Sequence, residues 1–151
     1  MSWTTEDFKQ TQTLGKQLSL SLKRGDVLAL CGDLGSGKTT FVQGVAVGLG
    51  VDETVTSPSF VLAHEYSGKE LTIYHLDLFR LEKEEDVETI GIEDYMAPDG
   101  VTLVEWADKI PEILPADYVK LQFETKSDQL RIVTATPHGE RAKQIVKAWG
   151  V

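Results

Sequence analysis

Apolar residues recur along the chain in two patterns, one typical of helices and the other of strands. Between positions 5 and 22, the residues with roughly helical spacing are Phe8, Leu14, Leu18 and Leu22. Charged and amide side chains separate them, so the spacing predicts an amphipathic helix over residues 5–22. Thr4 or Thr5 would be its N-cap, because a threonine hydroxyl can accept a hydrogen bond from the first free N–H groups of a helix.

A buried strand, a glycine-rich loop and a second helix follow in close succession. Residues 27–31 form a continuous apolar run, as expected of a parallel strand that is covered on both faces. Residues 40–49 are mostly apolar or small and predict a helix that ends at Gly50. Residues 32–39 therefore form a loop between the carboxyl end of the strand and the start of the helix.

A hairpin is predicted in the middle of the chain. Residues 59–66 and 71–77 have the composition of strands, and a turn at residues 67–70 separates them. Residues 51–57 have no helical period and lead to Pro58, which disfavours helix at the residue before it. Because a hairpin is antiparallel, the sheet is expected to be mixed rather than purely parallel.

The last third of the chain predicts three more strands and a closing helix. Residues 101–105 form another buried-strand candidate. After a connection that contains Pro111 and Pro115, residues 118–124 and 130–136 predict a second hairpin. The chain ends with a predicted helix over residues 139–149.

The loop at residues 32–39 carries a phosphate-binding pattern. Its sequence is Gly-Asp-Leu-Gly-Ser-Gly-Lys-Thr, in which two glycines separated by four residues precede Lys38 and Thr39. Glycines let the backbone curl so that its N–H groups point at one anion, and the helix that follows directs its positive end at the same place. Lys38 can reach the terminal phosphates of a nucleotide, and the Thr39 hydroxyl suits Mg²⁺.

The loop and its flanking elements predict the fold class. We expect an α/β protein with a P-loop-NTPase-like three-layer fold, a mixed and partly parallel sheet, and a single domain over residues 1–151. The expected cofactors are ATP and Mg²⁺. The phosphate-binding residues would be Asp33, Leu34, Gly35, Ser36, Gly37, Lys38 and Thr39.

A phosphate-binding loop needs a carboxylate from a neighbouring strand to complete its metal site. Asp77 and Glu105 each follow an apolar run, and acids at the carboxyl ends of parallel strands lie on the ligand edge of the sheet. Glu105 follows the cleaner run and is favoured as the metal ligand together with Thr39, directly or through water. Asp77 would hold a hydroxyl or a metal-bound water, or orient the attacking water; either acid could instead pair with a surface base.

Other residues near these positions leave two interpretations open. Trp106 either packs against the nucleotide or belongs to the core. Thr56 and Ser57 either form a switch that senses the terminal phosphate or lie in an ordinary loop. The three histidines lack metal-ligand spacing and are interpreted as structural: His64, His75 and His138.

Composition and charge narrow the function classes. The formal net charge of −9 argues against direct binding of nucleic acid, which needs a basic face. No apolar run approaches the length of a membrane span, and the polar, acidic first residues do not resemble a secretory signal. With the one cysteine, Cys31, in an apolar strand, we expect a cytoplasmic protein without disulfides.

Residues 81–91 look helical, and the acidic stretch 82–94 is either a solvated surface or a docking surface for a basic partner.

Several short motifs together resemble those of the TsaE family. They are GDLGSGKTT at 32–40, SPSF at 57–60, YHLDLFRL at 74–81, GIEDY at 91–95 and VEW at 104–106. The similarity runs from about Leu14 to Asp108, and the glycine-rich loop is the one motif that is specific by itself. Phe79 stands where the family often has tyrosine, which affects no catalytic group.

The resemblance implies an ATPase that binds ATP with Mg²⁺ and hydrolyses it slowly. It implies that Lys38, Asp77 and Glu105 serve catalysis, that Thr40 lines the phosphate site, and that Trp106 lies near the nucleotide. The segment around Thr5 and Glu6 is expected near the adenine. It also implies action with TsaB and TsaD, where TsaD transfers a threonylcarbamoyl group to adenosine 37 of tRNA. Contact with tRNA would then be indirect, and no membrane would be involved.

Two other functions remain as alternatives. A small-metabolite kinase would share the compact P-loop fold, but such enzymes usually carry a mobile lid with arginines, and the middle third of this chain is acidic. A nucleotide-gated binding module would use ATP to set its affinity for a partner, with incidental turnover.

Overall fold

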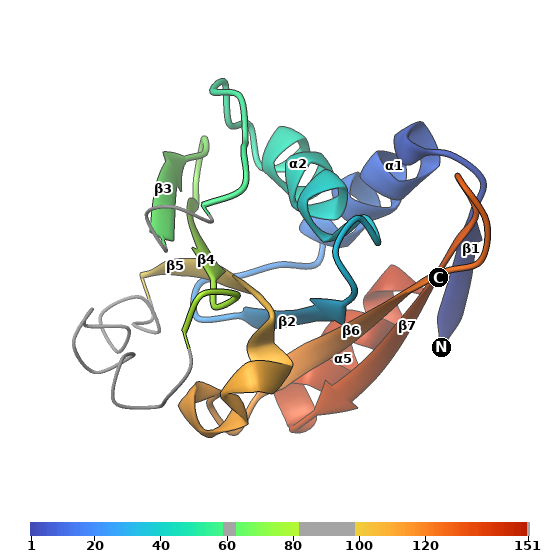
Figure 1. Ribbon diagram of the computed structural model, residues 1–151. Helices are drawn as coiled ribbons and strands as arrows, with labels where there is room; N and C mark the ends of the chain where they lie inside the picture. Colours follow the sequence, from blue (N-terminus) through green and yellow to red (C-terminus); the bar gives the residue numbers. More distant parts are fainter. Residues whose placement is uncertain (59–62, 82–98, 151) are drawn as a thin grey trace.

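The computed structural model describes residues 1–58, 63–81 and 99–150. Its described strands form one seven-stranded sheet in the order β1-β7-β6-β2-β5-β4-β3 (Figure 1). The strands are β1 Ser2–Thr5, β2 Val27–Gly32, β3 Ala63–Ser67, β4 Thr72–Asp77, β5 Gly100–Glu105, β6 Tyr118–Thr125 and β7 Arg131–His138.

The centre of the sheet is parallel and its edges are antiparallel. Strand β2 pairs in parallel with both β5 and β6, and β5 pairs in parallel with β4. The β3–β4, β6–β7 and β1–β7 pairs are antiparallel. The α/β class and the mixed, partly parallel sheet are therefore confirmed, as are both hairpins, although residues 59–62 of the first lie outside the described residues.

The three described α-helices pack on one face of the sheet: α1 Phe8–Ser19, α2 Lys38–Gly48 and α5 Glu140–Trp149. The Phe41 ring of α2 meets the Trp149 ring of α5 edge to face, with centroids 5.9 Å apart. Trp149 Nε1 also donates a hydrogen bond to the carbonyl of Leu14 in α1, at 3.3 Å. These contacts join the helices and the apolar residues of the central strands in one core, which fixes α2 against the sheet.

The opposite face of the sheet carries a smaller apolar cluster. Side chains alternate along β2, so Leu28 and Leu30 face the helices while Ala29 and Cys31 face the second cluster. Two short 3₁₀ segments, η1 Ala107–Lys109 and η2 Pro111–Ile113, follow β5 on this side. Cys31 is buried, as expected for a core residue. The predicted acidic helix at 81–91 and the acidic stretch 82–94 lie outside the described residues, apart from Leu81.

The start of the first helix differs from the sequence prediction. Thr4 and Thr5 are not its cap, because they belong to β1 and pair with Ile132 and Arg131 of β7. The N-cap is Asp7, whose carboxylate accepts a hydrogen bond from the Gln10 N–H at 2.8 Å. An aspartate is as good a cap as a threonine, and the edge pairing of β1 decides between them.

The first and last of the four apolar residues predicted for this helix, Phe8 and Leu22, also differ from the prediction. Helix α1 ends at Ser19, so Leu22 joins the core from the turn that follows the helix. Phe8 is 61% exposed and does not belong to the core. Its position at the first turn of α1 instead places it beside the cavity described below.

Helices α1 and α2 approach each other closely, and Figure 1 shows them side by side. A Cβ added to Gly44 of α2 would lie 1.9 Å from the Gln12 carbonyl of α1, so only glycine fits there. The close approach holds the first turn of α1 next to the loop at 33–37 that precedes α2. Thr11 of α1 consequently lines the same cavity as that loop.

Candidate functional site

A cavity of about 600 Å³ lies at the carboxyl ends of the parallel strands β2, β4 and β5. This edge is where open α/β sheets bind their ligands. The cavity is lined by residues 34–40 of the loop and α2, and by Phe8, Thr11, Ser57, Asp77, Phe79, Glu105, Trp106, Asp128, Gln129 and Arg131.

The glycine-rich loop turns sharply between β2 and α2. Gly35 has φ +78° and Gly37 has φ +105°, which are conformations that residues with side chains rarely adopt. Gly37 is the N-cap of α2 and offers no side chain to cap the helix. The first N–H groups of α2 are thus left for a ligand, and the positive end of the helix favours an anion.

Ser36 adds a second polar group to this loop. Its side chain is buried, and its Oγ has no hydrogen-bond partner among the described residues. Buried hydroxyls normally have a partner, because leaving one without a hydrogen bond costs free energy. Ser36 lines the cavity, so a bound anion would satisfy its hydroxyl.

Lys38 brings a positive charge into the cavity wall. Its Nζ donates to the carbonyls of Gly32 and Asp33, at 2.5 and 3.0 Å, and lies 4.0 Å from the centre of the Trp106 ring. Burial lowers the pKa of the Lys38 ammonium, while the charges of Glu105 and Asp77 oppose that change. The side chain folds back along its own loop, with the ammonium close to the two acids.

Thr39 and Glu105 face each other across the floor of the cavity. The Thr39 hydroxyl lies 3.1 and 2.9 Å from the two carboxylate oxygens of Glu105 and donates to them. Glu105 ends β5, opposite Leu30 of β2, and is only 3% exposed. The hydroxyl and the carboxylate are hard oxygen donors, the kind that Mg²⁺ prefers in nucleotide sites, where water and phosphate supply the remaining ligands. These two residues fit a magnesium ion.

Asp77 occupies the same position in the next strand. It pairs with Glu105 in the parallel register of β4 and β5. Its Oδ1 accepts from the Phe79 N–H at 2.8 Å, and its Oδ2 accepts from the Ser57 hydroxyl at 3.2 Å. The two acids predicted at strand ends thus lie side by side, with Asp77 bonded to Ser57 and Glu105 to Thr39.

The segment that carries Ser57 is fixed by contacts from two other elements. Gln43 of α2 donates from Nε2 to the Val55 carbonyl at 3.0 Å. The Tyr66 hydroxyl of β3 accepts from the Thr56 N–H at 3.3 Å and contacts His64 Nδ1 at 2.9 Å. Ser57 therefore reaches the cavity from a backbone held on both sides, and His64 has the structural role that the sequence indicated.

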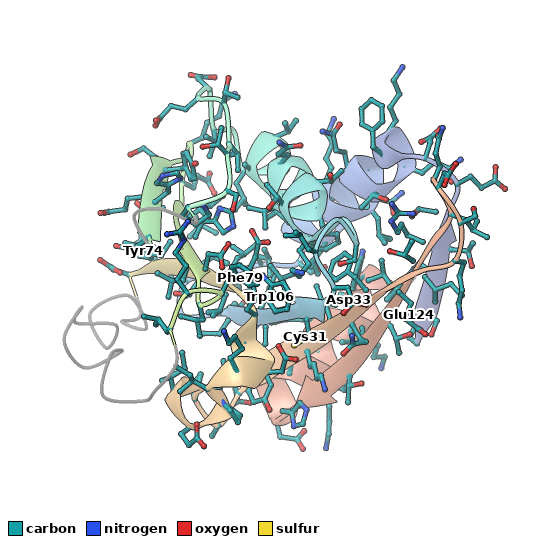
Figure 2. The ribbon with its side chains drawn as sticks, in the orientation of Figure 1. Cys31, Asp33, Tyr74, Phe79, Trp106 and Glu124 are labelled. Atoms are coloured by element: carbon teal, nitrogen blue, oxygen red, sulfur yellow. The ribbon has the colours of Figure 1, made fainter. Side chains whose placement is uncertain are left out.

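Trp106 and Phe79 lie next to each other in Figure 2, and both line the cavity together with Asp77 and Glu105. Their ring centroids are 4.9 Å apart. Trp106 has a left-handed backbone, with φ 59°, and its N–H donates to the Leu30 carbonyl at 2.9 Å. Trp106 thus lines the cavity and also packs against the second apolar cluster, whereas its contact with a nucleotide stays a prediction.

Three of the predicted binding residues do not line the cavity. Asp33 is exposed, although its carbonyl accepts from Lys38. Thr5 is buried, and its hydroxyl lies 2.8 Å from that of Thr11, which does line the cavity. Glu6 is exposed just before α1. The other predicted residues, namely 34–40, Asp77, Glu105 and Trp106, meet in one cavity.

The structure also adds residues that sequence reasoning missed. Arg131 is the first residue of β7 and donates to the Gly35 carbonyl at 3.2 Å, which ties the β6–β7 turn to the glycine-rich loop. Asp128 and Gln129 line the cavity from the same turn. His75 was interpreted as structural, yet its Nε2 lies 2.5 Å from Glu105 Oε2. His75 lies within the YHLDLFRL motif, but its contact with Glu105 depends on the pairing of β4 with β5, and no motif marks Asp128, Gln129 or Arg131.

The fold and site define an α/β protein with a strand, a glycine-rich loop and a helix beside two strand-end acids. Residues 5–133 match the family model described as threonylcarbamoyl adenosine biosynthesis protein TsaE. The chain belongs to the TsaE family, which takes its name from the biosynthesis of threonylcarbamoyladenosine in tRNA.

Individual relatives agree with the family model. The tRNA threonylcarbamoyladenosine biosynthesis protein TsaE of Bacillus subtilis (strain 168) is 39% identical over 145 residues, which cover 96% of this chain and 90% of that protein. The TsaE protein of Treponema pallidum (strain Nichols) is 36% identical over 134 residues, which cover 89% of this chain and 98% of the relative. The crystal structure of Bacillus subtilis YdiB superimposes with a TM-score of 0.86 at 35% identity, over 99% of this chain and 93% of that one.

The helices of the described residues were compared with the length and apolar character that a membrane span needs. Within residues 1–58, 63–81 and 99–150, none is both long enough and apolar enough to cross a bilayer.

Proposed function

We propose that this protein binds ATP with Mg²⁺ in the cavity and hydrolyses it slowly, as a subunit of the assembly that forms threonylcarbamoyl-adenosine at adenosine 37 of tRNA. The observation that carries the proposal is the Thr39–Glu105 pair, a hydroxyl and a carboxylate in contact at the floor of a glycine-rich loop. The membership of the chain in the TsaE family supports the tRNA-modification part of the proposal.

The loop and α2 would bind the phosphates. The N–H groups at the start of α2 and the buried Ser36 hydroxyl face the cavity without an internal partner among the described residues. Lys38 would exchange its contacts with the Gly32 and Asp33 carbonyls for contacts with phosphate oxygens. This exchange suits a lysine, whose single flexible ammonium is a mobile point charge.

The acids would prepare the site for hydrolysis. Thr39 and Glu105 would hold Mg²⁺, which supplies charge stabilisation to the phosphate oxygens when it is bound. Asp77 lies next to Glu105 at the end of the parallel strands and would accept a proton from, or orient, the attacking water. The Ser57 hydroxyl, which donates to Asp77, would hold that carboxylate in place.

The partners proposed for this chain are TsaB and TsaD, with tRNA contacted through them. The net charge of −9 supports an indirect contact, because phosphate backbones repel an acidic protein. We place the protein in the cytoplasm, where ATP and tRNA are both present. A nucleotide-gated binding module remains as a second candidate, because the Ser57 hydroxyl lines the cavity and donates to Asp77, where it would contact the terminal phosphate of a bound nucleotide.

Phosphate release from ATP tests the proposal. It would be measured for the wild type and for Glu105→Ala, each with and without the TsaB–TsaD partners. We expect slow release by the free protein, faster release with the partners, and loss of the partner-dependent part in Glu105→Ala. Glu112→Ala is the matched control, because Glu112 is an exposed acid that does not line the cavity.

The outcomes separate the candidate functions. Equal rates in the wild type and Glu105→Ala, with and without partners, contradict an ATPase role. Partner binding that changes with ATP, without faster phosphate release, favours the gated binding module. Transfer of phosphate to a small metabolite favours a kinase.

A further inference from the structure

We propose that His75 is a positioning residue for the Glu105 carboxylate and sets the metal affinity of the site. The proposal rests on the function proposed above, since it assigns a role to a neighbour of the Thr39–Glu105 pair. His75 lies in β4, between the neighbouring strands β3 and β5, where it pairs with His64 and Leu103.

The His75 ring makes its polar contact with Glu105. The side chain is fully buried, and Nε2 lies 2.5 Å from Glu105 Oε2. An ionised carboxylate only accepts hydrogen bonds, so Nε2 is the donor. The other ring nitrogen, Nδ1, is buried and has no partner within the described part of the chain. Glu105 is therefore the one polar group that the ring contacts there.

Core packing alone does not account for this arrangement. Burying a polar ring costs free energy, and the nitrogen without a partner adds to that cost. An apolar side chain would fill the same place without the cost. The contact with Glu105 offsets part of it and is the feature that an apolar residue cannot reproduce.

The geometry explains what His75 contributes. Glu105 has several rotatable bonds, and Thr39 contacts both of its oxygens at similar distances. Thr39 therefore restrains the carboxylate from a single point, its hydroxyl oxygen, and does not by itself set the tilt of the carboxylate plane about that point. The bond from His75 selects Oε2, which fixes the plane of the carboxylate and directs its remaining lone pairs toward the cavity. Outer partners of metal ligands typically change metal affinity 10- to 100-fold when they are removed.

Three substitutions at one position test the proposal. His75→Leu keeps a buried apolar side chain and removes the hydrogen bond. His75→Gln places an amide nitrogen about as far from the backbone as Nε2, whereas His75→Asn reaches only as far as Nδ1. The measured quantity is the affinity for Mn²⁺, which stands in for Mg²⁺. It is obtained by titration calorimetry on each protein with bound ADP.

We expect Mn²⁺ affinity to fall about 10- to 100-fold in His75→Leu and His75→Asn and to recover largely in His75→Gln. ADP affinity in the presence of EDTA should stay at the wild-type value in all three, because His75 does not line the cavity. Equal Mn²⁺ affinity in the Gln and Asn variants overturns the positioning role, even if the Leu variant fails to fold. Failure of the wild type to bind ADP or Mn²⁺ would instead contradict the proposed function itself.

Discussion

The hydroxyl of Thr39 donates to both carboxylate oxygens of Glu105, at 3.1 and 2.9 Å. The two residues lie 66 positions apart in the sequence and meet because β2 and β5 are parallel neighbours. Thr39 is the second residue of α2, which follows β2 through the glycine-rich loop, and Glu105 is the last residue of β5. The contact therefore joins the glycine-rich loop to the edge of the sheet where the second acid, Asp77, also lies.

Lys38→Met should weaken ATP binding without lowering the stability of the fold. The substitution removes the cavity's ammonium, so we expect ATP affinity to fall at least about tenfold, as for the loss of a charge-assisted hydrogen bond. The free energy of unfolding should stay within about 1 kcal/mol of the wild type or rise, because a buried ammonium is costly. Calorimetry and denaturant unfolding measure the two quantities. Lys126→Met, on an exposed turn residue, is the control. Wild-type ATP affinity in Lys38→Met would argue against the site.

Trp106 should report on the ligand by its fluorescence. The chain has three tryptophans, of which Trp3 and Trp149 stack on each other with centroids 3.9 Å apart and do not line the cavity. Lys38 lies over the Trp106 ring, so any movement of Lys38 toward phosphate changes the environment of that ring. We expect ATP to change the fluorescence of the wild type and of Trp3→Phe, but not that of Trp106→Phe. A full ATP-dependent change in Trp106→Phe would place the ligand elsewhere.

Ser57→Ala should lower turnover more than binding. The substitution removes the hydroxyl that donates to Asp77 Oδ2 at 3.2 Å. Since a hydrogen bond to a charged group contributes about 1.5–3 kcal/mol, we expect kcat to fall about tenfold or more. KM for ATP should change little, because the phosphates would be held by the loop. Steady-state kinetics with the partners present tests this, and Ser67→Ala in β3 serves as the control. A rise in KM at unchanged kcat would assign Ser57 to binding instead.

Gly44→Ala should destabilise the packing of α1 on α2. The added Cβ would lie 1.9 Å from the Gln12 carbonyl, so the helices must move apart. Overpacking of this kind costs about 1–3 kcal/mol of unfolding free energy. Val47→Ala, on the exposed side of the same helix, should change it by less than about 0.5 kcal/mol. Chemical denaturation compares the two variants, and equal stabilities would show that the interface tolerates a methyl group.

Local patterns in the sequence were enough to predict most of the sheet and the loop. The apolar runs at β2 and β5 and the turn residues of both hairpins are local signals, and the structure follows them. The acids Asp77 and Glu105 could be predicted because an acid after a parallel strand lies at the ligand edge whatever the strand order. The roles of the site residues in binding and catalysis stay predictions.

The residues that were missed depend on long-range pairing. Strand β1 is a short polar edge strand, and its pairing with β7 shifts the helix cap from Thr5 to Asp7. His75 meets Glu105 only because β4 lies next to β5, and Arg131 meets Gly35 only because the β6–β7 hairpin turns toward the loop. No spacing in the sequence encodes these contacts, so residue patterns alone left them out.

The most direct test of the proposed function is the formation of threonylcarbamoyl-adenosine in tRNA by the reconstituted assembly, compared between the wild type and Glu105→Gln. The amide keeps the size of the side chain but removes the charge that would hold the metal. ATP binding without metal should be the same in both proteins. We expect sustained modification with the wild type and little with Glu105→Gln; modification at the wild-type rate by Glu105→Gln would contradict the role assigned to the Thr39–Glu105 pair.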